Sequence, residues 1–308
     1  MKIATSSSPS LVLVCLTALA SSAFGFTTRL PTFGAPTAHQ RPAKQHSVIC
    51  TPTFNDRRKL LPPLFLSWGP EPTWSNAKVE SVTPASSNSV SVTLSVPSDV
   101  AEGFAVPGQY VQLKPSEDAK PLFLAVASSP DPSNPTFEFL IKKTDNNDWI
   151  TSPSAAGVSC LTSQIMGGGF PIAENIDGFK YDFPTQNVIM FATGSGIAPI
   201  RSVIEANALT LGKGRTARLY YGCKNLDEMA YKENFQKWEE MGVEVVPVLS
   251  QQEWEGRMGY VQTALEEDGV PIPRNSGALM CGVKGMCESV KDVLLRSGVF
   301  EGRVMTNF

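Results

Sequence analysis

The sequence predicts a two-domain fold. A small antiparallel β-barrel over residues 73–172 would precede a doubly wound α/β domain with a parallel sheet over residues 185–308. Residues 89–96 alternate strictly between polar and apolar side chains, which is typical of a half-buried strand. Residues 188–192 form a continuous apolar run, as in a parallel strand covered on both faces, and a glycine-rich turn follows them. Residues 1–66 fit neither domain.

Residues 1–66 have the composition of a targeting leader. The apolar run Leu11–Ala20 leads into Ser21–Ala23, which is typical of a cleavable signal peptide and too short for a transmembrane helix of about 20 residues. Residues 1–55 contain no Asp or Glu and are rich in hydroxyl and basic side chains, which indicates a transit peptide. This order is similar to the bipartite plastid presequences of algae with secondary plastids. We therefore expect a protein of the plastid stroma, with a secreted protein carrying a disordered leader as the alternative, and no transmembrane segment.

The composition outside this leader excludes several classes of function. The leader holds seven of the 26 basic and one of the 29 acidic residues, so the remainder carries 19 basic and 28 acidic residues, a net charge of −9. That charge does not favour nucleic acid or anionic lipid. Both histidines, His39 and His46, lie in the leader, which excludes Ser–His and Cys–His catalysis and histidine metal sites. The four later cysteines form no C-x-x-C pair, so neither a zinc ribbon nor a thioredoxin site is indicated.

The first half after the leader is predicted to be β-structure. After the alternating strand 89–96, the turn Pro107-Gly108 introduces a second alternating stretch, Gln109–Leu113. The apolar runs Leu122–Ala127 and Phe137–Ile141 are separated by a segment rich in proline and serine. Short strands with such punctuation and no long helical period predict a small barrel.

The second half alternates between predicted strands and helices, and the domain boundary is expected between Pro171 and Thr185. The predicted strands are Val188–Ala192, Ala217–Tyr221, Val243–Leu249 and Ala278–Cys281, and the predicted helices are Pro199–Leu209, Met229–Met241, Tyr260–Glu267 and Gly285–Ser297. This order predicts a doubly wound parallel sheet.

The segment Thr193–Pro199 lies where a predicted strand is followed by a helix. Gly194 and Gly196 remove Cβ atoms that would block a ligand. The free amides and the positive dipole end at a helix start suit a pyrophosphate, and Pro199 fits a first helical turn. The segment is not G-x-G-x-x-G, so a plain tight turn is the alternative.

Several motifs together resemble the ferredoxin–NADP reductase superfamily. The matching segments are Pro107–Tyr110 in the barrel, Ala192–Arg201 at the nucleotide loop, Tyr220–Gly222, Tyr231–Phe235, Met280–Met286 at the cysteine–glycine motif, and the aromatic Phe308. The resemblance covers nearly the whole chain after Thr73, and it is strongest to a plant and algal plastid branch of reductase-like proteins.

The resemblance implies hydride transfer between a nicotinamide nucleotide, NADP(H) or NAD(H), on the α/β domain and a flavin on the barrel. It assigns the pyrophosphate to Thr193, Gly194, Ser195 and Gly196, and makes Cys281 and Phe308 the catalytic positions, beside the nicotinamide and the flavin ring. The other implied nucleotide-binding residues are Pro199, Gly222, Ser250, Tyr260, Gly282 and Met286. The implied flavin-binding residues are Gln109, Tyr110, Val126, Ala127, Ser128, Gly169 and Phe170. Cys281 as an ordinary core residue, and Phe308 as a frayed tail, are the alternatives.

The flavin motif departs from the family pattern. The family carries Arg-x-Tyr-Ser, where this chain has Leu122, Leu124 and Ala125, so a phosphate-binding cation, a stacking aromatic and a hydroxyl are missing. Lys120 could supply charge only with a shifted loop. We expect FAD, with FMN less favoured. In NADP-using relatives an arginine often stands at Gln251, and Arg257 could compensate.

Two hypotheses follow. The first is an NAD(P)H-dependent flavoprotein oxidoreductase with an unidentified electron acceptor. The second is a non-catalytic NADP(H)-binding sensor or scaffold that has lost flavin turnover. The net charge of −9 argues against a basic docking face for ferredoxin, and the sequence indicates no oligomeric state.

Overall fold

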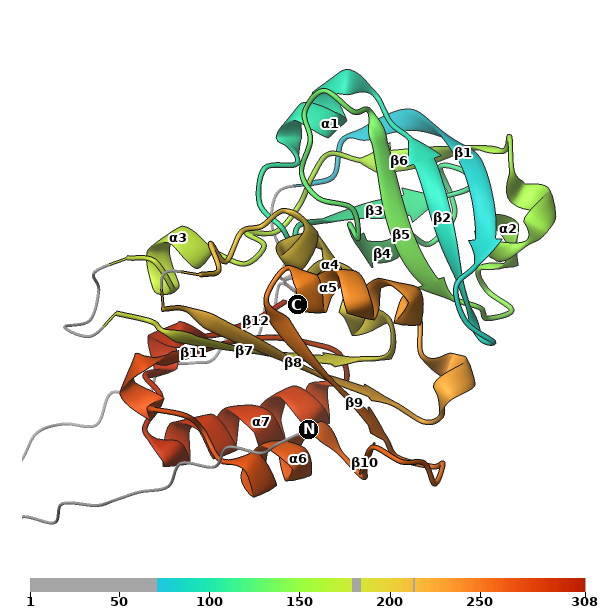
Figure 1. The fold of residues 1–308 in the computed structure, drawn as a ribbon. Helices are drawn as coiled ribbons and strands as arrows, with labels where there is room; N and C mark the ends of the chain where they lie inside the picture. Colours follow the sequence, from blue (N-terminus) through green and yellow to red (C-terminus); the bar gives the residue numbers. More distant parts are fainter. Residues whose placement is uncertain (1–70, 179–183, 213, 308) are drawn as a thin grey trace, which may run out of the picture. The chain divides into compact units, whose positions relative to one another are not determined.

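The computed structural model describes residues 71–178, 184–212 and 214–307, and it contains both predicted sheets (Figure 1). A six-stranded antiparallel barrel sheet precedes a six-stranded parallel sheet flanked by helices, which confirms the predicted fold class. The expected leader and Phe308 lie outside the described residues. Within the described ranges, no helix is both long and apolar enough to cross a bilayer.

The barrel sheet has the strand order β4-β3-β6-β1-β2-β5. Its strands are β1 (Trp74–Pro84), β2 (Ser89–Ser95), β3 (Tyr110–Lys114), β4 (Leu122–Ala125), β5 (Thr136–Lys142) and β6 (Ser159–Ser163). The alternation in β2 places Val92 and Leu94 in a fully buried core with Phe139 of β5, as the period of two requires. Two short helices, α1 (Ser98–Gly103) and α2 (Asp148–Thr151), were not predicted.

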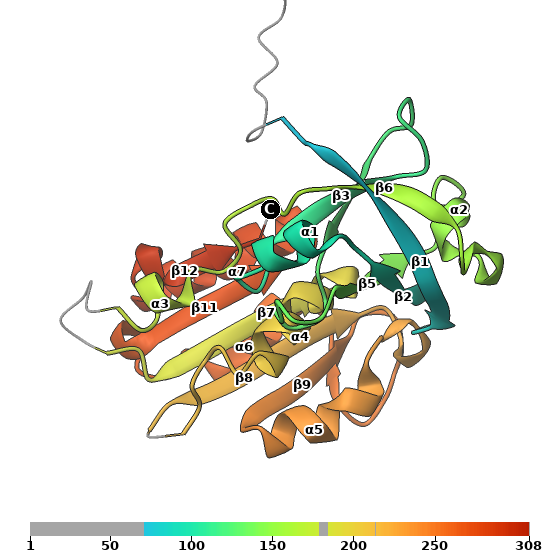
Figure 2. The ribbon, with the colours of Figure 1, turned by 90° about the horizontal axis from the view of Figure 1, so that it is seen from above.

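The second sheet has the order β10-β9-β8-β7-β11-β12, and all of its strands are parallel. Its strands are β7 (Asn187–Thr193), β8 (Thr216–Cys223), β9 (Val243–Leu249), β10 (Arg257–Met258), β11 (Ser276–Cys281) and β12 (Val304–Thr306). Its helices are α4 (Ile197–Glu205), α5 (Phe235–Glu240), α6 (Val261–Asp268) and α7 (Lys284–Ser297), while α3 (Ile172–Asn175) lies in the connection from the barrel. Helices α4 and α5 cover the face toward the barrel, and α6 and α7 cover the other face (Figures 1 and 2).

Two predicted helices were wrong in their extent. The helix expected over Met229–Met241 is an α-helix only over α5, because Tyr231 has a left-handed backbone with φ of 61° and separates two short 3-10 turns. The helix expected to end at Leu209 ends at Glu205, and Asn207 then takes a φ of 51°. The edge strands β10 and β12 were not predicted, since two or three residues carry no readable period.

The barrel and the parallel sheet share one hydrophobic cluster. Ala127, Leu140 and Phe170 of the barrel side are buried with Ile197 and Ile200 of α4. Since packed cores resist deformation, the helix that begins at the glycine turn is held directly against the barrel. This contact fixes the position of the site described next.

Candidate functional site

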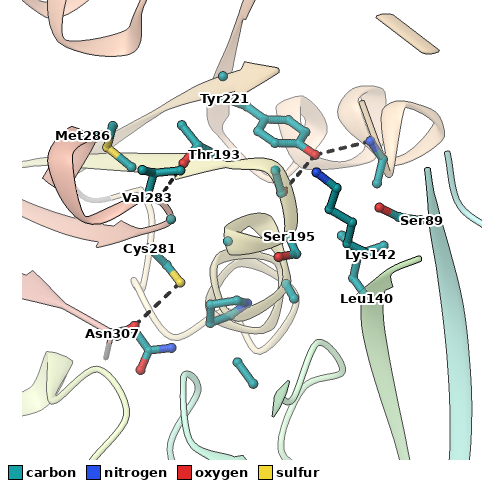
Figure 3. Close-up of a pocket in the computed structure, with 18 of the residues that line it drawn as sticks. Ser89, Leu140, Lys142, Thr193, Ser195, Tyr221, Cys281, Val283, Met286 and Asn307 are labelled. Carbon is teal, nitrogen blue, oxygen red and sulfur yellow. Dashed lines mark hydrogen bonds between the residues drawn. The ribbon is translucent and has the colours of Figure 1, made fainter. Parts of the chain in front are cut away.

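A cavity of about 1240 Å³ lies between the barrel strands β3–β5 and the carboxyl ends of strands β7, β8 and β11 (Figure 3). Ligands of open α/β sheets bind at these strand ends, outside the carboxyl edge. The cavity therefore combines a nucleotide-binding edge with a wall from a second sheet.

The glycine turn forms the floor of the sheet side. Strand β7 ends at Thr193, a 3-10 turn spans Gly194–Gly196, and α4 begins at Ile197. Gly194 has a φ of 55°, and a Cβ added to it would meet nothing within 4 Å. Gly194 and Ser195 are exposed, so the backbone of this turn is open to the cavity at the positive end of α4.

Two glycines allow the ends of β7 and β11 to meet. A Cβ on Gly196 would lie 2.2 Å from the Cys281 carbonyl oxygen, and one on Gly282 would lie 2.0 Å from Thr193 Oγ1. Thr193 Oγ1 also accepts a hydrogen bond of 3.0 Å from the Val283 amide. No side chain fits at either glycine, so the close approach of these two segments depends on them.

Cys281 lines the cavity at the end of β11, where Figure 3 shows its sulfur directed toward Asn307. Its thiol lies 3.7 Å from the Asn307 carbonyl oxygen, and burial raises the pKa of this thiol to about 12. The side chain is therefore an un-ionised thiol at neutral pH, which suits a packing surface and not a nucleophile. The Asn307 amide donates to the Met280 carbonyl at 3.0 Å, which brings residue 307 to the cavity wall.

Tyr221 holds the glycine turn through its hydroxyl group. Its hydroxyl donates to the Gly194 carbonyl and accepts from the Ala230 amide, both at 3.3 Å (Figure 3). Burial raises the pKa of this phenol well above its usual value, so it remains protonated. Because the Tyr221 hydroxyl binds the Gly194 carbonyl, the turn is held in one orientation.

The outer end of the sheet side carries an exposed aromatic ring and one lysine. Tyr260, just before α6, is 63% exposed, and Lys224 follows β8 beside Ser250, whose amide donates to the Cys223 carbonyl at 3.0 Å. Arg257 does not line the cavity, since its guanidinium pairs with Asp268 and with Glu267 near the end of α6.

The barrel wall is formed by the outer face of β3–β4 and by β5. Tyr110, Phe123 and Ala125 line it, and Lys142 extends from β5 toward the side of the cavity that carries Tyr221 (Figure 3). Leu122 and Leu124 pack against the barrel core, and Leu124 also reaches the cavity.

The structure brings most of the predicted site residues together. The cavity lining includes Tyr110, Thr193, Gly194, Ser195, Gly196, Pro199, Gly222, Ser250, Tyr260, Cys281, Gly282 and Met286. These residues come from separate strand ends and from both sheets, so the sequence motifs do converge in space.

Six predicted flavin-side residues do not line the cavity, namely Gln109, Val126, Ala127, Ser128, Gly169 and Phe170. Val126, Ala127 and Phe170 have buried side chains in the barrel and the shared core. The side-chain Oε1 of Gln109 accepts from the amides of Ala105 and Val106, and Ser128 Oγ accepts from the Glu138 amide. These side chains are engaged in packing and hydrogen bonds within the protein.

Many cavity residues were not predicted, among them Lys142, Phe123 and Asn307. The alternation of β5 could have indicated Lys142, because it shares a face with Leu140. The pairing of β3 with β4 places Phe123 beside Tyr110, but that register is not visible in one sequence. No sequence pattern indicates the three-residue strand β12, so Asn307 could not be predicted at the cavity.

A glycine turn at the carboxyl edge of a parallel sheet, facing an antiparallel barrel across one cavity, is the arrangement of a two-domain dinucleotide-binding protein. Residues 190–292 match the family model described as the oxidoreductase NAD-binding domain. Over 247 residues the chain is 35% identical to the fruit protein pKIWI502 of Actinidia deliciosa, an alignment that covers 75% of this chain and 76% of that relative.

The chain is also similar to a chloroplastic ferredoxin–NADP reductase, leaf isozyme 1, of Oryza sativa subsp. indica, with 29% identity over 140 residues, 39% of this chain and 37% of that one. Its fold is similar to that of a ferredoxin NADP+ reductase from Neisseria gonorrhoeae solved with bound FAD and NADP. The TM-score is 0.63 at 18% identity, covering 77% of this chain and 100% of that chain. The chain belongs to the ferredoxin–NADP reductase superfamily.

Proposed function

We propose that this protein is an NAD(P)H-dependent flavoprotein oxidoreductase that moves hydride between a nicotinamide nucleotide and a bound flavin. The observation that carries the proposal is the single cavity with the Thr193–Gly196 turn and Cys281 on one wall and the β3–β5 face of the barrel on the other. Its volume of about 1240 Å³ exceeds the roughly 300–1,000 Å³ of ordinary ligand pockets, which supports two ligands side by side.

The residues present fit a nicotinamide nucleotide. The open space at Gly194 and the exposed backbone of Gly194 and Ser195, at the positive end of α4, would form a cradle for a pyrophosphate. A Cβ at Gly196 would clash with the Cys281 carbonyl and displace this turn. Thr193 and Gly282 would hold the nucleotide at the strand ends, with Cys281 beside the nicotinamide. Ser250 and Tyr260 would hold its adenosine end.

The residues present also fit the ring part of a flavin, because the barrel wall offers apolar and aromatic surface. Lys142 is the cation that this wall supplies to phosphates. A second cavity beside α2 is lined by Asp145 and Asp148 as well as by Lys143, and this net negative charge disfavours a phosphate there. We propose FAD as the flavin and FMN as the alternative.

The chain has little chemistry of its own to perform. When both cofactors are bound, they supply the hydride donor and acceptor, the nicotinamide C4 and the flavin N5. The Tyr221 hydroxyl fixes the glycine turn, which would orient the nucleotide. The un-ionised Cys281 thiol would pack against the nicotinamide without competing as a nucleophile. Positioning at about 3–3.5 Å and exclusion of water then account for most of the rate.

The absorbance spectrum of the purified protein tests this proposal. A flavin spectrum that bleaches anaerobically on addition of NADPH or NADH is expected. The matched control is Ser195→Asp, at an exposed position of the same turn, which should retain the flavin spectrum but lose bleaching at ordinary NADPH concentrations, because its carboxylate repels the pyrophosphate. A colourless protein that neither FAD nor FMN reconstitutes would contradict the proposal.

A nucleotide sensor is the second candidate. It is favoured by one observation: Leu122 and Leu124, which occupy the family's arginine and tyrosine positions, pack against the barrel core. A sensor binds NADPH in a calorimeter but reduces no acceptor dye. Dye reduction that depends on Cys281 would reject it.

We also propose that the protein resides in a plastid. Support comes from the composition of residues 1–66 and from the similarity to a chloroplastic reductase. A fluorescent protein fused behind residues 1–66 should enter plastids, whereas appearance in the medium would favour secretion.

A further inference from the structure

The barrel wall of the cavity carries an exposed aromatic pair. Phe123 of β4 is 63% exposed, and its ring centroid lies 6.0 Å from that of Tyr110 with the planes tilted by 42°. Both residues line the cavity. The pair therefore offers aromatic surface to whatever occupies the barrel side.

Strand register explains why these rings face the same way. Tyr110 is paired with Ala125, and Gln112 with Phe123, in the antiparallel ladder of β3 and β4. Paired residues and residues two apart project from one face of a sheet. Tyr110 and Phe123 are thus diagonal neighbours on the outer face of the barrel.

The Tyr110 ring is fixed from behind by a glycine. Gly167 has a φ of 75°, and a Cβ there would lie 2.7 Å from the Tyr110 ring. The ring thus packs on bare backbone, and the Gln109 side-chain amide donates to the Gly167 carbonyl at 3.3 Å. A ring held in this way is a rigid surface that loses little entropy when a ligand stacks on it.

In the part of the chain that the structure describes, the exposed aromatic rings lie in this cavity. Within residues 71–178, 184–212 and 214–307, Phe123 and Tyr260 are the two aromatic side chains among the large exposed hydrophobic residues. Both are 63% exposed and both line the cavity, Phe123 on the barrel wall and Tyr260 on the sheet side. Leaving a phenyl ring in water costs hydrophobic free energy, which a stacked ligand recovers.

We propose that Tyr110 and Phe123 form the stacking surface for the isoalloxazine ring of the flavin. This inference rests on the proposed function and deepens it by assigning the ring to the face of residues 110 and 123. Two flat aromatic side chains favour a planar, conjugated ligand. The flavin is that ligand, because this wall faces the Thr193–Gly196 turn across the cavity. Tyr260 takes no part in holding the flavin ring.

Binding of lumiflavin, the flavin ring without phosphates, tests the proposal. It is titrated into flavin-stripped full-length protein and followed by quenching of its fluorescence, while binding of 5′-AMP is measured by calorimetry. Phe123→Ala should weaken lumiflavin binding about tenfold and leave 5′-AMP binding unchanged. Phe123→Tyr should bind lumiflavin as the parent does. Because Phe123 is exposed, neither substitution should lower the thermal unfolding midpoint.

Tyr260→Ala is the matched control, since Tyr260 is equally exposed in the same cavity. It should weaken 5′-AMP binding and leave lumiflavin binding unchanged. If Phe123→Ala binds lumiflavin like the parent, the stacking assignment is overturned while the proposed function stands. If Phe123→Ala instead weakens only the binding of a soluble quinone, the barrel wall binds an aromatic electron acceptor, and the flavin assignment is likewise overturned. A parent protein that binds 5′-AMP but no flavin overturns both.

Discussion

Arg201 of α4 donates a hydrogen bond of 2.6 Å to Glu138 of β5, and this charged pair joins α4 to the barrel. The same guanidinium bonds Glu205 at 3.1 Å and lies over the Tyr231 ring. Nearby, the Ser202 hydroxyl donates to the Ser128 carbonyl at 2.7 Å. The two walls of the cavity are therefore held together by polar contacts as well as by the shared core.

Loss of the Arg201 pair should lower stability and disturb the site together. Arg201→Leu is expected to reduce the free energy of unfolding by about 2 kcal/mol, because the largely buried Glu205 loses its close guanidinium partner and keeps only the more exposed Lys237 at 3.4 Å. A double-mutant cycle with Glu138→Gln in urea unfolding should give a coupling of about 1 kcal/mol or more. The exposed pair Arg218–Glu244 is the control, with an expected coupling below about 1 kcal/mol. Equal couplings for the two pairs would contradict this account.

The glycine at position 196 should tolerate no side chain. Gly196→Ala is expected to cost about 3 kcal/mol or more in unfolding and to abolish NAD(P)H binding, because the new Cβ would lie 2.2 Å from a backbone carbonyl. Gly285→Ala, in α7 with open space around it, is the control and should be neutral or stabilising by up to about 1 kcal/mol. Calorimetric titration with NADPH and urea unfolding measure both effects.

Substitution of Cys281 should affect turnover more than nucleotide affinity. Cys281→Ala removes the side chain that packs against residue 307, so the ring beside it loses its fixed position and dye reduction should fall about tenfold or more. Cys287→Ala is the matched control, since Cys287 is buried in α7 and does not line the cavity. A Cys281→Ala protein with parental turnover would remove this residue from the catalytic positions.

Stability should decline as the pH rises above about 9. Burial raises the pKa of Cys160 to about 11 and that of Cys281 to about 12, against an ordinary value of 9.0. Between the ordinary pKa of 9.0 and the raised pKa of the folded protein, the thiols of the unfolded chain lose their protons and those of the folded chain do not, so rising pH favours unfolding. Below pH 9 both states are protonated, and the protein keeps its full stability. Thermal midpoints measured from pH 8 to 11 should fall, and Cys160→Ala should make the fall shallower. A midpoint independent of pH over this range would refute the expectation.

Lys224, not Arg257, should set any preference for a 2′-phosphate. Arg257, which the sequence left as a possible partner, is bound by Glu267 and Asp268 outside the cavity lining, whereas Lys224 lines the cavity next to Ser250. Lys224→Gln should weaken the binding of adenosine 2′,5′-bisphosphate about tenfold, because a charge-assisted contact is lost, and should change the binding of 5′-AMP little. Arg257→Gln should leave both affinities unchanged. Calorimetry with the two ligands distinguishes the residues.

Much of this fold could be predicted because its elements have clear periods. The alternation of β2 and the apolar run of β7 each identified a strand, and the motif around Thr193 identified the turn that joins a strand to a helix. These are local properties of the chain. The convergence of Cys281 with that turn followed from the family resemblance, and the structure places them in contact.

The rest depended on relationships that no local pattern encodes. Tyr231 interrupts a helical pattern by adopting a left-handed backbone, which a single sequence does not reveal. The flavin-side motif predicted Val126 and Ala127 at the site, but tertiary packing buries both. Phe123 became visible only through the register of β3 against β4.

The short strand β12 makes the wall of the cavity depend on the edge of the parallel sheet. It pairs with β11 and delivers Asn307 to the wall of the cavity, beside the Cys281 sulfur. A substitution that loosens this three-residue strand would therefore shift the neighbour of the Cys281 sulfur and reshape the cavity without altering any of the motif residues.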